Sequence, residues 1–168
     1  TLPVISGVAE GADISEENGG DNYSLSFDGV DDYVEIPHNN NQVLMPELSI
    51  MTWVRFDSPT DWSNGNGGHA LIEKMEHVSA NANYSYGLIT EYDWDALRFD
   101  LKLDNGDAIN LRFEPFSSSM IVGQWHHIAA VYDGDNSFIY FDGQLVAASL
   151  VSSSGSIFNS AYPISIAS

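Results

Sequence analysis

Turn residues interrupt the chain about every ten residues, and this spacing limits the possible folds more than any other feature of the sequence. Between the turns lie short runs rich in β-branched and aromatic side chains, and no window has the 3.6-residue apolar period of a helix. The pattern predicts an all-β fold, a two-sheet antiparallel jelly-roll sandwich. Strands are expected near residues 23–28, 32–36, 47–56, 70–74, 84–90, 96–103, 107–113, 125–132, 137–142, 144–149 and 163–167.

Two of these strands indicate how the sheets are buried. In residues 97–103 apolar residues alternate with charged ones, which predicts one face in the core and the other in solvent. In residues 48–56 both faces are apolar, as in a central strand whose second face is covered or forms a ligand groove. Trp53 and Trp125 lie within strand segments and are therefore expected in the core.

Asn-Gly and Asp-Gly pairs mark the tightest turns. Asn105 and Gly106 separate two apolar runs, and both residue types tolerate positive φ. They predict a type I′ hairpin turn at this position. Asp142 and Gly143 are expected to play a similar part between the last long strands.

The size of the chain suits one domain. With 168 residues, 43% of them hydrophobic, it can bury roughly 68–70% of its unfolded surface without metal or disulfide staples. Residues 1–22 are polar and glycine-rich, and we expect a linker or an N-terminal edge strand there. Residues 23–168 are expected to form the sandwich. Because the sequence begins with Thr1 and not Met, we expect a piece of a longer or processed chain.

The charge of the chain restricts its partners. Five Lys and Arg residues stand against 24 Asp and Glu residues, a formal net charge of −19. This excludes binding to nucleic acid phosphates and disfavours anionic lipid. No apolar run is long enough for membrane insertion, and the absence of cysteine excludes disulfides and thiolate chemistry. The acidic, Asn- and Ser-rich composition favours a secreted or cell-surface protein, although a soluble protein from a salty habitat would share it.

Three blocks of sequence resemble a known family. Residues 25–37 contain Phe-Asp-Gly-Val-Asp-Asp-Tyr-Val, residues 48–55 carry a Trp on a strand ending in Arg, and residues 123–146 open with Gly-Gln-Trp-His-His. In order and spacing they are similar to laminin-G-like, concanavalin A-like lectin/glucanase domains over residues 23–167. The resemblance implies a jelly roll of two curved sheets, common in carbohydrate-binding and adhesion modules that often hold calcium. The family continues into a closing strand where this sequence stops, so that strand is either lacking or replaced by residues 1–22.

Three carboxylates in one expected turn are candidate metal ligands. Asp28, Asp31 and Asp32 lie between two strand segments, and calcium takes six to eight oxygen ligands. The resemblance also points to calcium as the cofactor. The same residues can equally build the turn without a metal ion.

Two loops, residues 57–69 and 76–86, are longer than hairpins require and carry the candidate carbohydrate site. Aromatic faces stack on the apolar C–H patches of sugars, and Asn and Asp side chains pair with hydroxyls. The candidate residues, including one aromatic residue beyond these loops, are Trp62, Tyr84 and Trp94 for stacking and Asp57, Asp61, Asn64 and Asn83 for hydrogen bonds. Alternatively, Trp62 and Tyr84 cap one end of the sandwich.

Catalytic patterns are weaker. Glu91, Asp93 and Asp95 would share one face of a strand, as the paired carboxylates of glycosidases do. The resemblance, however, places residues 91–95 at a hairpin tip, and laminarinase-like active sites have Glu where this chain has Asp95. His126 and His127 point to opposite faces of a strand and cannot hold one ion together. We therefore expect no enzyme and assign no catalytic residue.

The sequence thus predicts a non-catalytic extracellular binding module that recognises polysaccharide or glycan and holds calcium. One alternative is an adhesion or spacer domain of a large bacterial surface protein, with a protein partner. A second alternative is a glycoside hydrolase or polysaccharide lyase.

Overall fold

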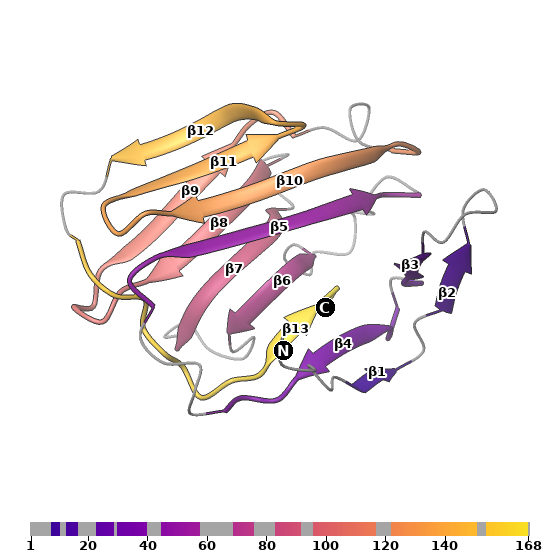
Figure 1. The fold of residues 1–168 in the computed structure, drawn as a ribbon, viewed down its shortest axis with the longest axis horizontal. Helices are drawn as coiled ribbons and strands as arrows, with labels where there is room; N and C mark the ends of the chain where they lie inside the picture. The colour runs from indigo at the N-terminus through magenta and orange to yellow at the C-terminus, as the bar shows by residue number, and fades with distance from the viewer. Residues whose placement is uncertain are drawn as a thin grey trace, which may run out of the picture.

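Two antiparallel β-sheets form the body of the protein (Figure 1). The structure is a computed structural model that describes residues 8–10, 13–16, 23–28, 30–39, 45–57, 69–75, 83–91, 96–116, 122–150 and 154–167. These residues contain strands and turns, and none of them belongs to a helix that could cross a membrane. The two-sheet jelly-roll sandwich expected from the sequence is confirmed.

The larger sheet has seven strands and the smaller one four. In spatial order the seven are β1 (Val8–Glu10), β4 (Tyr33–Ile36), β13 (Ile164–Ile166), β6 (Ala70–Met75), β7 (Tyr84–Glu91), β8 (Ala96–Lys102) and β9 (Ala108–Phe113). The four are β12 (Gln144–Leu150), β11 (Asn136–Phe141), β10 (Trp125–Tyr132) and β5 (Leu48–Arg55). A separate hairpin pairs β2 (Asp13–Glu16) with β3 (Tyr23–Ser26). Every strand expected from the sequence is present, and its ends differ by two residues at most.

The core lies between the two sheets. Leu97, Phe99 and Leu101 of β8 are completely buried and belong to one apolar cluster with Ile128 of β10 and Ile139 of β11. The apolar face expected for this strand is therefore confirmed. Alternation of side chains along each strand supplies this layer, because every second residue points inward.

The second face of β8 differs from the expectation of open solvent. Asp100 is only 4% exposed, although the alternating pattern placed it in water. Arg98 Nε lies 2.8 Å from one carboxylate oxygen, and the Asn110 amide donates a hydrogen bond of 2.5 Å to the other. Burial raises the pKa of Asp100, while Asn110 and Arg98 oppose that rise. Polar partners on the same strand and on β9 thus allow this carboxylate to be buried.

Two expectations about β5 were wrong. This strand lies at the edge of its described sheet, next to β10 alone, rather than in the centre. Trp53 is 64% exposed and Trp125 is 37% exposed, so neither belongs to the core. The inward positions of β5 are instead taken by residues such as Ile50, which is 7% exposed. Because both faces of this strand carry apolar residues, apolar content alone did not show which one is buried.

The tightest hairpin turn joins β11 to β12. Asp142 has a φ of 49° and Gly143 a φ of 77°, the two positive values that a type I′ turn requires. At the other expected type I′ turn only Gly106 has positive φ, at 93°, so that expectation was wrong. There the Asn105 side chain accepts a hydrogen bond of 2.9 Å from the Asp107 amide, which stabilises a different local turn.

Tyr132 hydrogen-bonds to the segment that precedes β13. Its ring is completely buried, and its hydroxyl lies 2.8 Å from the Gly134 carbonyl oxygen and 2.9 Å from that of Gly155. Burial raises the pKa of this phenol. The hydroxyl therefore holds a neighbouring turn and a segment distant in sequence to the same strand.

We predict that Tyr132→Phe lowers the free energy of unfolding by about 1–3 kcal/mol, because it removes the donor from two partly buried carbonyl groups. Urea unfolding measures the effect. Tyr140→Phe is the matched control on the neighbouring strand, where the ring is only half-buried. Equal losses of stability in the two variants would contradict the role assigned to Tyr132.

Candidate functional site

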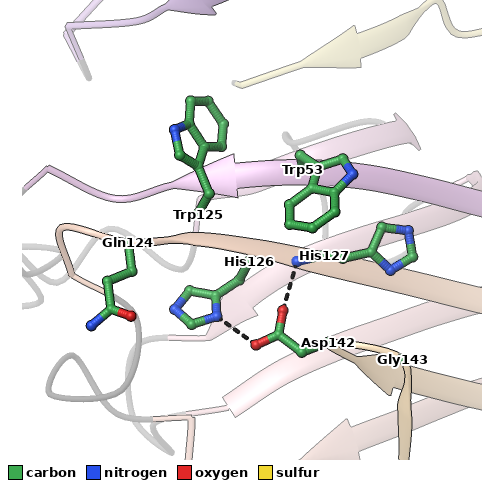
Figure 2. A pocket seen from close by; sticks show the side chains of 7 residues that line it. All are labelled: Trp53, Gln124, Trp125, His126, His127, Asp142 and Gly143. Carbon is green, nitrogen blue, oxygen red and sulfur yellow. Dashed lines mark hydrogen bonds and ion pairs between the residues drawn. The ribbon is translucent and has the colours of Figure 1, made fainter. Parts of the chain in front are cut away.

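A hollow opens on the four-stranded sheet where β5, β10 and the β11–β12 turn meet (Figure 2). Its volume is about 690 Å³, and it is shallow and open to solvent. Both aromatic and polar side chains line it: Trp53, Gln124, Trp125, His126, His127, Asp142 and Gly143.

Strand register places two indoles on the same outer face. Trp53 stands opposite His127 on the neighbouring strand, and Trp125 stands opposite Arg55. The Trp53 and His127 rings are 5.4 Å apart at their centroids and inclined by 59°. The Arg55 guanidinium lies 5.5 Å from the centroid of Trp125, within range of a cation–π contact. Neighbouring side chains thus restrain both indoles, which stay partly open to solvent.

His126 points the other way, into the sandwich. Its ring stacks on Phe141, with centroids 4.7 Å apart and an angle of 25°. The opposite orientations expected for His126 and His127 are therefore confirmed. Nδ1 of His126 lies 2.8 Å from Asp142 Oδ2, as Figure 2 shows. Since an ionised carboxylate only accepts hydrogen bonds, this nitrogen carries the proton.

Asp142 is held at the rim of the hollow by two hydrogen bonds. Besides the bond from His126, its Oδ1 accepts the His127 amide N–H at 2.9 Å. The bond from the His126 side chain is the main cause that lowers the pKa of Asp142, with the His127 amide contributing. The carboxylate is therefore ionised at neutral pH and fixed in direction, while its side chain remains 46% exposed.

Among the described residues, those that line the hollow include no hydroxyl or thiol side chain. What they do supply is two indole surfaces, an amide and a fixed carboxylate. Such a set can hold a ligand that has both flat apolar patches and hydroxyl groups.

Three of the seven carbohydrate residues expected from the sequence lie among the described residues. Asp57 follows β5 and accepts a hydrogen bond of 2.8 Å from Arg55. Tyr84 and Asn83 lie at the start of β7, where the Lys102 ammonium is 5.9 Å from the Tyr84 ring. Trp62, Asp61, Asn64 and Trp94 lie outside the described residues.

The two long loops connect to opposite ends of β7. The Thr90 amide donates a hydrogen bond of 2.9 Å to the His69 carbonyl, so the loop of residues 57–69 ends beside the last residues of that strand. Tyr84 is the first residue of β7, about 20 Å away at the usual rise per residue. Tyr84 and Asn83 therefore do not form one site with the end of the 57–69 loop.

Sequence reasoning missed Trp53 and Trp125 as site residues. One signal was present: Met51, Trp53 and Arg55 recur with period two, so the strand carries a basic residue on the same face as its Trp. A face that includes Arg is more often outward than inward. The expectation of a core position gave more weight to the apolar neighbours.

Glu91 forms ion pairs with two arginines. Its Oε1 lies 2.5 Å from Arg98 Nη1 and 2.9 Å from Arg112 Nη2, and its side chain is 17% exposed. Two guanidinium groups thus hold this carboxylate in place. Asp93 and Asp95 lie outside the described residues.

The three aspartates of the expected metal site do gather in one turn. Asp28, Asp31 and Asp32 bring carboxylate oxygens to within 4.8 Å of one another. Asp28 Oδ1 accepts the Val30 and Asp31 amides at 2.8 and 3.4 Å, and Asp32 Oδ2 accepts the Asp28 amide at 3.0 Å. These bonds order the turn and leave the second oxygens of Asp28 and Asp32, and both of Asp31, available to a cation. The donor set fits a hard cation such as calcium.

Fold and site together define a two-sheet jelly-roll domain with an open aromatic hollow on one sheet. The family model described as the concanavalin A-like lectin/glucanases superfamily matches residues 28–168, and the chain belongs to this superfamily. No curated protein sequence matches the chain significantly.

Solved structures share the fold at low identity. The binding domain of Paraclostridial Mosquitocidal Protein 1 is 17% identical, with a TM-score of 0.71 over 95% of this chain and 38% of that one. The receptor-binding domain of botulinum neurotoxin mosaic serotype C/D is 16% identical, with a TM-score of 0.66 over 96% and 37%. The ligand-binding domain of botulinum neurotoxin serotype D, in complex with N-acetylneuraminic acid, is 16% identical, with a TM-score of 0.57 over 81% and 32%. The chain thus spans less than half of each of these structures.

The His126–Asp142 pair makes a prediction about acid stability. Because the folded pKa of Asp142 lies below its usual value of 3.8, the pair stabilises the fold above about pH 4 and loses this effect as the pH falls through the folded pKa. Asp142→Asn keeps a residue that tolerates positive φ but removes the charge. We expect the free energy of unfolding of this variant to fall less steeply than that of the wild type between about pH 4 and about pH 2. Urea unfolding at a series of pH values measures it, and parallel curves would contradict the prediction.

Proposed function

We propose that the chain is a non-catalytic module that binds carbohydrate in the hollow beside Trp53 and Trp125. In this proposal it holds calcium at the Asp28 turn and works outside the cell. The observation that carries the proposal is the pair of exposed indoles on a sheet face, beside polar groups whose positions are fixed.

The chemistry of the hollow supports a sugar ligand. Sugar rings have apolar C–H faces that stack on indoles, and hydroxyls at their edges that need donors and acceptors. Trp53 and Trp125 offer the stacking surfaces. Gln124 offers an amide, and Asp142 offers an ionised carboxylate held in place by His126. A purely apolar ligand would leave these polar groups without partners.

The relatives give further support. The superfamily takes part of its name from lectins, and one protein of similar fold is known in complex with N-acetylneuraminic acid. The superfamily also includes glucanases, but Glu91 is held by two arginines. An adhesion or spacer domain that binds a protein remains the alternative, and a glycan-binding experiment separates the two.

We predict that Trp53→Ala and Trp125→Ala each weaken glycan binding by at least about tenfold, because central aromatic anchors carry much of the binding free energy at such sites. Urea unfolding should change little, since both rings are partly exposed. A glycan and polysaccharide array, probed with wild-type protein in calcium and in EDTA, identifies the ligand for these measurements.

Two further variants are the comparators. Leu25→Ala shortens an apolar side chain that is 44% exposed on β3 and should leave binding unchanged. Trp62→Ala tests the loop that the sequence pointed to. Loss of binding in Trp62→Ala alone would move the site to residues 57–69, and failure of the wild type to bind any glycan would overturn the proposed function.

The calcium proposal makes a separate prediction. Calcium titration should give a dissociation constant of about 10⁻⁴ to 10⁻³ M, the range of extracellular modules, and raise the midpoint of thermal unfolding. The double variant Asp28→Asn and Asp31→Asn should lose both effects, while Asp135→Asn, in a distant turn, should keep them. Isothermal calorimetry and differential scanning fluorimetry measure them. A wild type that releases no heat with calcium would leave the aspartates as turn residues only.

A further inference from the structure

The hollow is one end of a longer apolar surface on the outer face of the four-stranded sheet. Strand register places seven large apolar or aromatic side chains on this face, which we name the apolar strip: Met51, Trp53, Trp125, Val131, Phe138, Tyr140 and Leu145. Met51 is 69% exposed and Leu145 is 54% exposed. The outward residues of β10 span about 20 Å from Trp125 to Val131 at the usual rise per residue.

The strip is continuous with the hollow. Met51, Ala129, Tyr140 and Leu145 pair in register as one row across all four strands. This row lies two residues along β5 from Trp53, so it is the next outward row after the hollow. Ala129 is only 6% exposed, and its short side chain forms a floor between the larger Met51 and Tyr140.

The charge of the strip differs from that of the rest of the chain. The chain carries 24 Asp and Glu residues, yet β5, β10, β11 and β12 contain none, and Arg55 is the one Lys or Arg in these four strands. Asp142, in the turn at the rim, is the carboxylate that lines the hollow. A chain with a net charge of −19 repels polyanions at long range, while the strip offers an uncharged ligand apolar contact without charges to desolvate.

We infer that the strip extends the binding site of the hollow, so that the ligand is an extended polysaccharide chain built of uncharged sugars and not a single terminal sugar. The inference rests on the proposed function. The hollow is open to solvent and the row of Met51 continues it along the sheet, so successive rings can contact this surface through their C–H faces. The polar groups of the hollow fix one sugar unit, and the apolar strip contacts the units that follow.

The test measures affinity against chain length with named probes. Cellohexaose, xylohexaose and mannohexaose are compared with the disaccharide of each series by isothermal calorimetry, and hexasaccharides of hyaluronan and alginate serve as charged probes. At least one neutral hexasaccharide should bind about tenfold or more tightly than its disaccharide, because each further ring buries apolar surface. The charged hexasaccharides should bind more weakly than the neutral ones.

Variants in the row of the strip next to the hollow locate the effect. Met51→Gln and Leu145→Gln should reduce the hexasaccharide affinity toward that of the disaccharide and leave disaccharide binding unchanged. Leu25→Gln, at an apolar residue of β3 that is 44% exposed and lies outside the strip, is the matched control and should change neither. Urea unfolding of each variant checks that stability is retained.

Three results would overturn the inference, and they differ from one another. Equal affinity for disaccharide and hexasaccharide would confine the ligand to the hollow, and the proposed function would stand. Binding of charged hexasaccharides as tight as that of neutral ones would exclude the uncharged class. Binding of no probe, together with self-association that Met51→Gln abolishes in sedimentation equilibrium, would make the strip a contact between copies of the chain and overturn the proposed function as well.

Discussion

The pairing of β5 with β10 is the interaction on which the core and the site both depend. It runs from Trp125 opposite Arg55 to Tyr132 opposite Leu48, along the whole length of both strands. Because side chains alternate between the two faces, a slip of one residue in either strand would exchange its inward and outward sets. Such a slip in β5 would bring Trp53 into the core and expose Ile50. The same register that buries Ile50 therefore also presents the indole of Trp53 beside His127.

The local sequence pattern was sufficient to predict the strands and the fold class. It did not predict the burial that depends on which strands are neighbours in the sheet. The alternation of residues 97–103 correctly predicted which face of β8 is buried, since one face is uniformly apolar. Residues 48–55 have two apolar faces, so burial there depends on where β5 lies in its sheet, and sequence neighbours do not determine that. The burial of Asp100 could not be predicted from the local pattern either. Its partner Asn110 belongs to the next strand and becomes its neighbour only through the register of β8 and β9.

The candidate sites differ in the same respect. One is formed by residues close together in the sequence, and the others need segments that only the fold brings together. The turn with Asp28, Asp31 and Asp32 was found from the sequence, because residues so close along the chain stay together in any tight turn. A site shared by residues 57–69 and Tyr84 depends on which elements lie side by side, and His69, at the described end of that loop, pairs with Thr90 at the opposite end of β7 from Tyr84. The residues of the hollow were not predicted as one site for a related reason. Its residues come from β5, from β10 and from the turn after β11, and only the fold brings them together.

An exposed apolar strip on an edge strand is normally a hazard, since it invites association between copies of the chain. Natural sheets often protect such strands with charged residues along the strand itself, but the four strands of this sheet carry one charged residue, Arg55. The acidic residues lie elsewhere in the chain, and its net charge of −19 makes two copies repel each other before their apolar surfaces can meet. This repulsion acts at long range and does not occupy the strip, so an uncharged ligand still has access to it. The distribution of charge thus reconciles solubility with an open apolar surface: the strands keep the chemistry of a binding face, and the rest of the chain supplies the repulsion that keeps that face free.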